Sequence, residues 1–105
     1  MKISKEKLQK IIFRLVQNSD PISVIGFGSF VRGNMRKDSD LDLLVIEEKL
    51  LNPRKEMVRL RRLLKDEEII LDILPVDFKT YSDWKDVKGN IFYNINKEGK
   101  ILYEK

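Results

Sequence analysis

Residues 28–46, which read GSFVRGNMRKDSDLDLLVI, constrain this chain more than any other stretch. A Gly-Ser pair and a polar loop lead to two aspartates at the head of the apolar run 43–46. Such a run, bounded by a loop, predicts a mostly buried strand. Side chains alternate between the faces of a strand, so Asp40 and Asp42 are expected on one face, with Cα atoms about 6.5–7 Å apart. Two carboxylates at this spacing can bind Mg²⁺, which prefers a few carboxylates together with phosphate oxygens.

The Gly-Ser pair distinguishes this motif from an ordinary acidic strand end, where most aspartates are only solvated. Glycine lets the backbone approach a phosphate closely. Ser29 adds a hydroxyl, and the residues after it are expected to open a short helix whose N–H groups face the same site. Gly28 and Ser29 are therefore predicted to bind phosphate. For Arg32, a contact with a triphosphate and a structural ion pair within the loop are equally consistent with the sequence.

Other phosphate motifs and several catalytic classes are excluded. Val31 stands where the third glycine of GxGxxG belongs, and no Gly-Lys-Ser/Thr follows, which disfavours a dinucleotide fold and a P-loop. The chain contains no cysteine and no histidine. Disulfides, thiolate nucleophiles, zinc fingers and Ser-His-Asp triads are therefore ruled out. Chemistry here depends on carboxylates, lysines, tyrosines or hydroxyls.

The length of 105 residues predicts a single domain, 1–105. A formal net charge of +4 favours polyanionic ligands, but only weakly. No apolar run approaches the roughly 20 residues that span a bilayer, and the N-terminus lacks the apolar core of a signal peptide. We therefore expect a cytoplasmic protein without membrane contact.

Hydrophobic periodicity and breaker residues predict helices and strands in alternation. Ser4 is expected to cap the first helix, Pro53 to begin a basic one and Asp77 to cap a short one. A polar linker is expected over residues 47–52. The predicted helices cover residues 5–17, 53–65, 78–84 and 89–97, and the predicted strands cover 22–27, 43–46 and 69–74. Residues 101–103 are expected to form a terminal strand or an extended tail. This order predicts an α/β (α+β) fold, with a small mixed sheet flanked by helices.

Asp72 interrupts the apolar run 69–74 and is the best candidate for a third carboxylate. A charge within a buried strand is costly unless it is paired or binds a metal. Asp77 competes for this role, but Pro75 is expected to end regular strand pairing before it.

The combined pattern of Gly28-Ser29, Arg32-Gly33, Ser39-Asp40 and Asp42 with its apolar tail resembles the DNA polymerase beta-like nucleotidyltransferase superfamily. Within it, the form GSxxRGxxxxxSDxDLLV is similar to minimal nucleotidyltransferases, which are often the antitoxins of HEPN–MNT toxin–antitoxin pairs. In those proteins the third acid lies in a strand motif with which residues 71–76 align without a gap, so that Asp72 occupies its position.

The resemblance implies a nucleotidyltransferase fold and a metal-dependent activity. Asp40, Asp42 and Asp72 would be the catalytic, metal-binding carboxylates, for two Mg²⁺ ions or Mn²⁺. Gly28, Ser29, Arg32, Asp40 and Asp42 would bind the nucleotide. ATP would be the substrate, and AMP would pass to a tyrosine hydroxyl of a partner HEPN toxin. A non-catalytic antitoxin that acts by binding and a nucleic-acid-binding module built on the basic helix 53–65 remain open alternatives.

Overall fold

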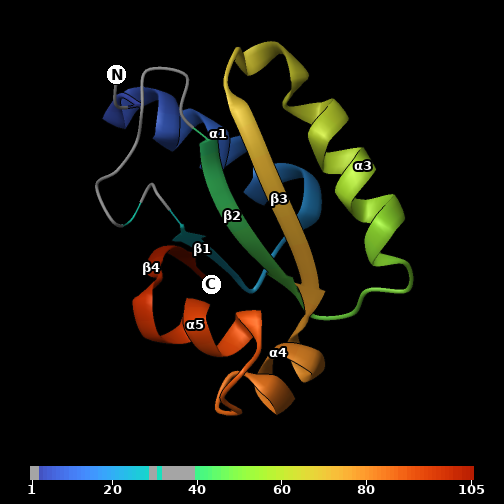
Figure 1. Cartoon of the computed structure of the whole chain (residues 1–105). Coiled ribbons are helices and arrows are strands. Elements are labelled where there is room, and N and C mark those ends of the chain that lie inside the picture. Colours follow the sequence, from blue (N-terminus) through green and yellow to red (C-terminus); the bar gives the residue numbers. More distant parts are fainter. Residues whose placement is uncertain (1–2, 29–30, 32–39) are drawn as a thin grey trace.

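A four-stranded mixed sheet forms the middle layer of the computed structural model, which describes residues 3–28, 31 and 40–105, except for the side chain of Asp40 (Figure 1). The strand order is β3-β2-β1-β4. β1 pairs antiparallel with both β2 and β4, whereas β2 and β3 are parallel. The strands are β1 (Ser23–Phe27), β2 (Asp40–Glu47), β3 (Ile70–Asp77) and β4 (Lys100–Glu104). The α/β class with a small mixed sheet is therefore confirmed.

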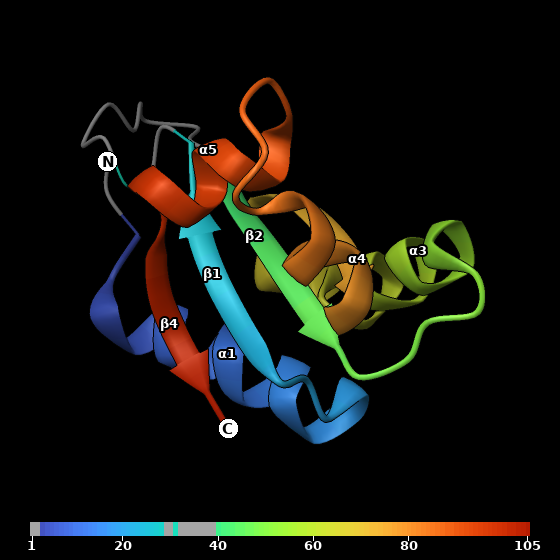
Figure 2. The same ribbon diagram turned by 90° about the horizontal axis from the view of Figure 1, so that it is seen from below.

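Helices cover both faces of this sheet (Figures 1 and 2). α1 (Lys5–Ser19) and α3 (Pro53–Leu63) pack on one face, where their leucines and isoleucines meet Leu41, Leu43 and Val45 of β2. α4 (Phe78–Trp84) and α5 (Ile91–Glu98) pack on the other face, against Leu44 and Ile46. This alternation along β2 produces two cores, one on each face of the sheet. A 3₁₀ turn, η1 (Lys65–Glu67), follows α3.

Side-chain caps fix where the helices begin. Ser4, Asn52 and Asp77 each accept a hydrogen bond at 3.1 Å from the backbone N–H three residues later. Such caps satisfy N–H groups that have no partner within the helix. The predicted roles of Ser4 and Asp77 as caps and of Pro53 at the first turn are confirmed. Asn90 caps α5 in the same way, one residue after the predicted start at Gly89.

Pro75 does not end the pairing of β3, and this prediction was wrong. Parallel pairing with β2 continues through Val45 opposite Pro75 to Glu47 opposite Asp77. β3 is one of the two edge strands of the sheet, and proline is tolerated on an edge strand because its missing N–H can face away from the neighbouring strand.

Arg14 links the first helix to the end of α3. Its guanidinium donates hydrogen bonds to Asp66 at 2.9 Å, to Glu67 at 2.5 Å and to the Leu63 carbonyl at 2.6 Å. Glu67 is only 5% exposed, so it needs this partner, because a buried carboxylate without one is costly. The contact joins segments that are distant in sequence and helps position α3 beside the sheet.

Glu47 belongs to the sheet and not to a polar linker, which corrects the prediction for residues 47–52. It is the last residue of β2 and is 9% exposed, and its Oε2 has no hydrogen-bond partner in the described part of the chain. Burial is the main cause that raises the pKa of Glu47 to about 8, and a hydrogen bond with Glu56 is the second cause. Arg59 donates to both oxygens of Glu56, at 2.7 and 2.8 Å, and lowers its pKa. A protonated Glu47 therefore donates to the Glu56 carboxylate at neutral pH.

None of the helices in the described ranges is long and apolar enough to span a membrane.

Candidate active site

Two of the three predicted aspartates are direct neighbours in the sheet. Asp42 of β2 pairs with Asp72 of β3 on one side and with Phe27 of β1 on the other. Directly opposed residues of adjacent strands project to the same face. The two carboxylates therefore occupy one row across the sheet, on the face that α4 and α5 cover further along the strands.

Asp40 begins β2 two residues before Asp42, opposite Ile70 of β3. Its side chain lies outside the described part of the structure. The strand that was predicted over residues 43–46 thus extends to both aspartates.

Gly28 lies against the Asp42 carboxylate. It follows β1 directly, with a φ of +72°, and a Cβ atom built on it would lie 2.2 Å from Oδ2 of Asp42. Only glycine can adopt this conformation and leave that oxygen in place. The sequence analysis assigned Gly28 to close approach of a phosphate, and the structure adds a second reason for a glycine here, since Gly28 lies against the Asp42 carboxylate. The carbonyl of Gly28 accepts from Val31 N–H at 3.2 Å, which closes the turn.

Asp72 lies at the exposed edge of the sheet, and the expectation of a buried charge was wrong. Its side chain is 65% exposed, because β3 is an edge strand and the apolar run around Asp72 is only partly covered. Its described partner is Arg61 of α3, whose Nη2 lies 3.4 Å from Oδ1. The argument for Asp72 therefore rests on its register with Asp42.

Arg61 was not singled out by the sequence. It is one of several basic residues in the helix predicted over residues 53–65. A β-strand, helix, parallel β-strand unit packs its helix back against the sheet. Applied to β2, α3 and β3, this rule predicts that α3 lies against the sheet, where one of its arginines can reach β3.

Several predicted site residues lie outside the described ranges. These are Ser29 and Arg32 of the predicted phosphate-binding turn, and Gly33 and Ser39 of the family motif lie outside the described ranges as well. Their roles remain predictions.

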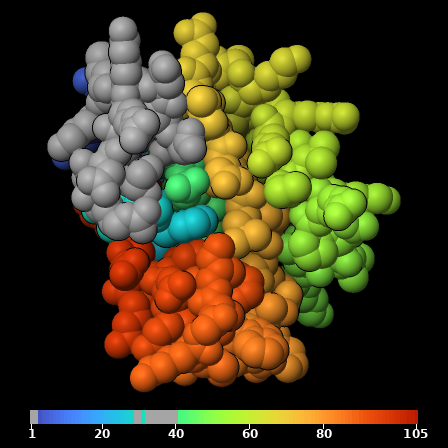
Figure 3. Space-filling view, viewed as in Figure 1, coloured from blue at the N-terminus to red at the C-terminus, as the bar shows by residue number. Residues whose placement is uncertain are grey.

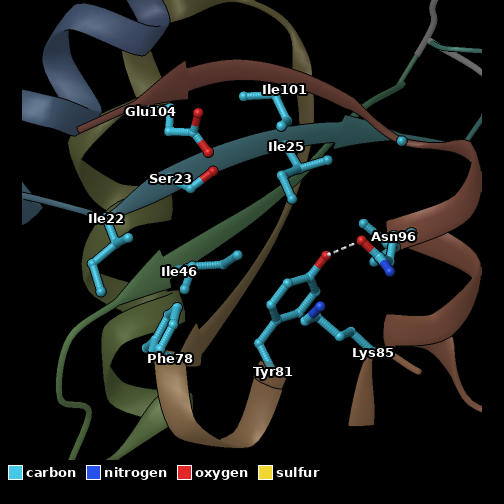
Figure 4. A pocket seen from close by; sticks show the side chains of 12 residues that line it. Ile22, Ser23, Ile25, Ile46, Phe78, Tyr81, Lys85, Asn96, Ile101 and Glu104 are labelled. Carbon is cyan, nitrogen blue, oxygen red and sulfur yellow. Dashed lines mark hydrogen bonds between the residues drawn. The ribbon is translucent and has the colours of Figure 1, made fainter. Parts of the chain in front are cut away.

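The acidic row reaches the molecular surface. Figure 3 shows the end of β1 and the start of β2 exposed between α5 and β3. A separate cavity of about 260 Å³ lies on the same face at the opposite end of the strands, near Ser23 and Ile46 (Figure 4). There Tyr81 donates a hydrogen bond to Asn96 at 3.4 Å. Neither Asp42 nor Asp72 lines this cavity.

The donor set suits a hard divalent cation. Asp42 and Asp72 supply carboxylate oxygens at one level of the sheet, and the missing Cβ of Gly28 leaves room for the Asp42 carboxylate itself. Mg²⁺ and Mn²⁺ prefer such oxygen ligands. No group of three or more acidic side chains able to hold a metal occurs among the described residues, a set that does not include the Asp40 side chain.

The family model for polymerase beta nucleotidyltransferase domains matches residues 9–105. This is nearly the whole chain, which therefore belongs to that family. The fold matches solved structures as well. A protein from Sulfolobus solfataricus assigned to the nucleotidyltransferases has a TM-score of 0.64 at 17% identity, and the match covers 95% of this chain and 79% of that one. The predicted nucleotidyltransferase fold is thus confirmed.

Two toxin–antitoxin structures are similar to the same degree. A mutant of the MntA-HpeT toxin–antitoxin complex has a TM-score of 0.64 at 22% identity, over 93% of this chain and 72% of that one. A toxin–antitoxin structure with AMP-PNP has a TM-score of 0.64 at 20% identity, over 92% and 73%. At these identities the likeness concerns the fold. No curated protein sequence matches.

Proposed function

We propose that this chain is a magnesium-dependent nucleotidyltransferase that acts as an antitoxin in the cytoplasm. It would transfer AMP from ATP to a tyrosine hydroxyl of a HEPN-family toxin. The observation that carries the proposal is the register of Asp42 with Asp72 beneath the turn at Gly28. The fold shared with toxin–antitoxin structures, one of them with the ATP analogue AMP-PNP, supports the choice of partner and nucleotide.

The proposed reaction is an in-line displacement at the α-phosphorus of ATP. Asp40, Asp42 and Asp72 would hold two Mg²⁺ ions, or alternatively Mn²⁺. When bound, the metal would offset the negative charge on the attacking and leaving oxygens. The tyrosine oxygen forms a new P–O bond, the bond between the α- and β-phosphates breaks, and pyrophosphate leaves. Asp72, the outermost acid of the row, would accept the proton of the attacking hydroxyl.

The phosphate end of the nucleotide is assigned to the turn after β1. The backbone at Gly28 would approach the β- and γ-phosphates, while the Ser29 hydroxyl and the Arg32 guanidinium would bind their oxygens. Gly28 also keeps the Asp42 carboxylate in position, so that one turn serves both the nucleotide and the acids.

A tyrosine acceptor suits a site without a strong base. The phenol has a pKa of about 10, well below that of an aliphatic hydroxyl, and so needs less help to lose its proton. The attached adenylate adds bulk and negative charge to the toxin, which would hinder RNA from reaching a nuclease site.

Ligand-induced stabilisation tests this proposal. Neighbouring carboxylates repel one another unless a cation lies between them, so Mg²⁺ with ATP should raise the melting temperature by about 5–10 °C at saturating concentrations. Asp42→Asn should fold normally and lose most of this shift. Asp83→Asn is the matched control, because Asp83 is an exposed residue of α4 that pairs with Lys79. An equal shift in Asp42→Asn and wild type would place metal and nucleotide elsewhere.

A further inference from the structure

One flank of α3 borders the β3 edge of the sheet, and its Arg61 contacts Asp72 of the acidic row. Leu60 and Leu64 face the core, and Arg61 reaches past the edge of the sheet to Asp72. Residues four and seven positions apart lie on the same side of a helix, so Arg54, Val58 and Arg61 share this flank. All three are exposed. Figures 1 and 3 show α3 lying alongside β3.

Arg61 lies at the β3 side of the acidic row, away from the turn at Gly28. Gly28 lies at the β1 side of Asp42, where the phosphates are proposed to bind, and Asp72 lies at the β3 side. Ile70 is 57% exposed and lies two residues before Asp72 on the same strand, hence on the same face. Around Asp72 the surface therefore combines a guanidinium with an exposed apolar side chain.

We propose that Arg61 and Ile70, which lie around Asp72, form a surface that binds an acidic protein segment carrying the acceptor hydroxyl, and that Val58 and Arg54 extend this surface along α3. The inference rests on the proposed function and specifies its acceptor. A guanidinium offers five N–H donors in a planar fork that matches a carboxylate. Its contact with Asp72 is long, and both side chains are at least half exposed, so water and a second carboxylate can compete for it. Arg61 is then a specificity residue that selects an acceptor with a carboxylate near its hydroxyl.

The composition of this surface favours a protein over a nucleic acid. α3 contains no aromatic residue, so it offers no ring on which an exposed base could stack. Val58 and Ile70, 40% and 57% exposed, instead provide apolar contacts bordered by cations, which is the usual make-up of a protein interface.

The test measures binding of defined probes to the full-length protein by fluorescence anisotropy. The probes are a labelled peptide with a tyrosine between glutamates, the same peptide with glutamines, and a single-stranded RNA of equal net charge. Wild type should prefer the acidic peptide over both other probes. Arg61→Ala should weaken that binding about tenfold, and Arg61→Lys should restore part of it. Arg62→Ala is the matched control, since Arg62 is an exposed neighbour on α3 about 100° around the helix from Arg61, and it should change the affinity less than twofold.

Each other outcome overturns the inference. Equal affinity of wild type and Arg61→Ala, or an equal loss in Arg62→Ala, would show that only diffuse charge attracts the peptide. Tighter binding of the RNA with the same dependence on Arg61 would assign the surface to nucleic acid. The outcome is separable from the proposed function. Selective binding of the acidic peptide, together with no transfer of AMP from ATP to the HEPN-family toxin, would refute the adenylyltransferase activity and leave the binding surface in place.

Discussion

Replacing Gly28 by alanine is expected to reduce nucleotidyl transfer by about 100-fold while the protein still folds. The added Cβ would lie 2.2 Å from Oδ2 of Asp42, so the carboxylate has to rotate out of the acidic row. Misplacing a reacting or binding group by about 1 Å can cost this factor in rate. Calorimetric titration with ATP and Mg²⁺ should show a parallel loss of affinity for ATP, because the added Cβ also narrows the space in which a phosphate approaches the backbone.

Gly89→Ala separates this effect from backbone strain. Gly89 also has a positive φ, +96°, but a Cβ built there meets no atom within 4 Å. Both variants should lose about 1 kcal/mol of stability, the usual cost of placing a side chain in this region of φ and ψ. Only Gly28→Ala should lose nucleotide binding. If both variants bind ATP as wild type does, the nucleotide does not use the turn after β1.

Glu47→Gln is expected to stabilise the protein at alkaline pH by about 2–4 kcal/mol. The pKa of Glu47 is about 8 in the folded state against an ordinary value of 4.5, so the folded state retains a proton that the unfolded state has lost. Wild-type stability should therefore fall as pH rises from about 4.5 to 8, and this contribution should be constant above 8. A glutamine keeps the hydrogen bond to Glu56 at every pH, because its amide donates without a titrating proton.

Urea unfolding at pH 5, 7 and 9 measures this slope. The gain in Glu47→Gln should be small at pH 5 and largest at pH 9. Glu48→Gln provides the control, since Glu48 is the exposed neighbour in sequence and its replacement should leave the pH dependence of wild type unchanged. A variant Glu47→Gln with the wild-type slope would show that another group is responsible. The lowered pKa of Glu56 acts below its ordinary value of 4.5 and does not affect this window.

Local sequence signals predicted the helices and strands, and they predicted that acidic residues and a glycine turn occur together. The helix caps at Ser4 and Asp77 depend on contacts within three residues, and such short-range chemistry is visible in the chain itself. The face shared by the two acids of β2 follows from alternation along a strand. Asp72, the predicted third acid, lies next to Asp42, whereas the argument that its charge is buried was wrong.

The remaining features depend on which strand forms the sheet edge and on how α3 packs. Strand order decides that β3 is exposed, and this explains both the exposure of Asp72 and the tolerance of Pro75. The raised pKa of Glu47 depends on its burial and on its hydrogen bond with Glu56 of the following helix. The contact of Arg61 with Asp72 likewise joins a helix to a strand. No local pattern encodes these tertiary contacts.

Intact mass spectrometry of the partner toxin tests the central claim most directly. The HEPN-family toxin, incubated with this protein, ATP and Mg²⁺, should gain mass in increments of one AMP and lose its nuclease activity. The Asp40→Ala protein should produce neither change. If the toxin mass stays constant and the Asp40→Ala protein still silences the nuclease, inhibition occurs by binding and the proposed enzymatic role is wrong.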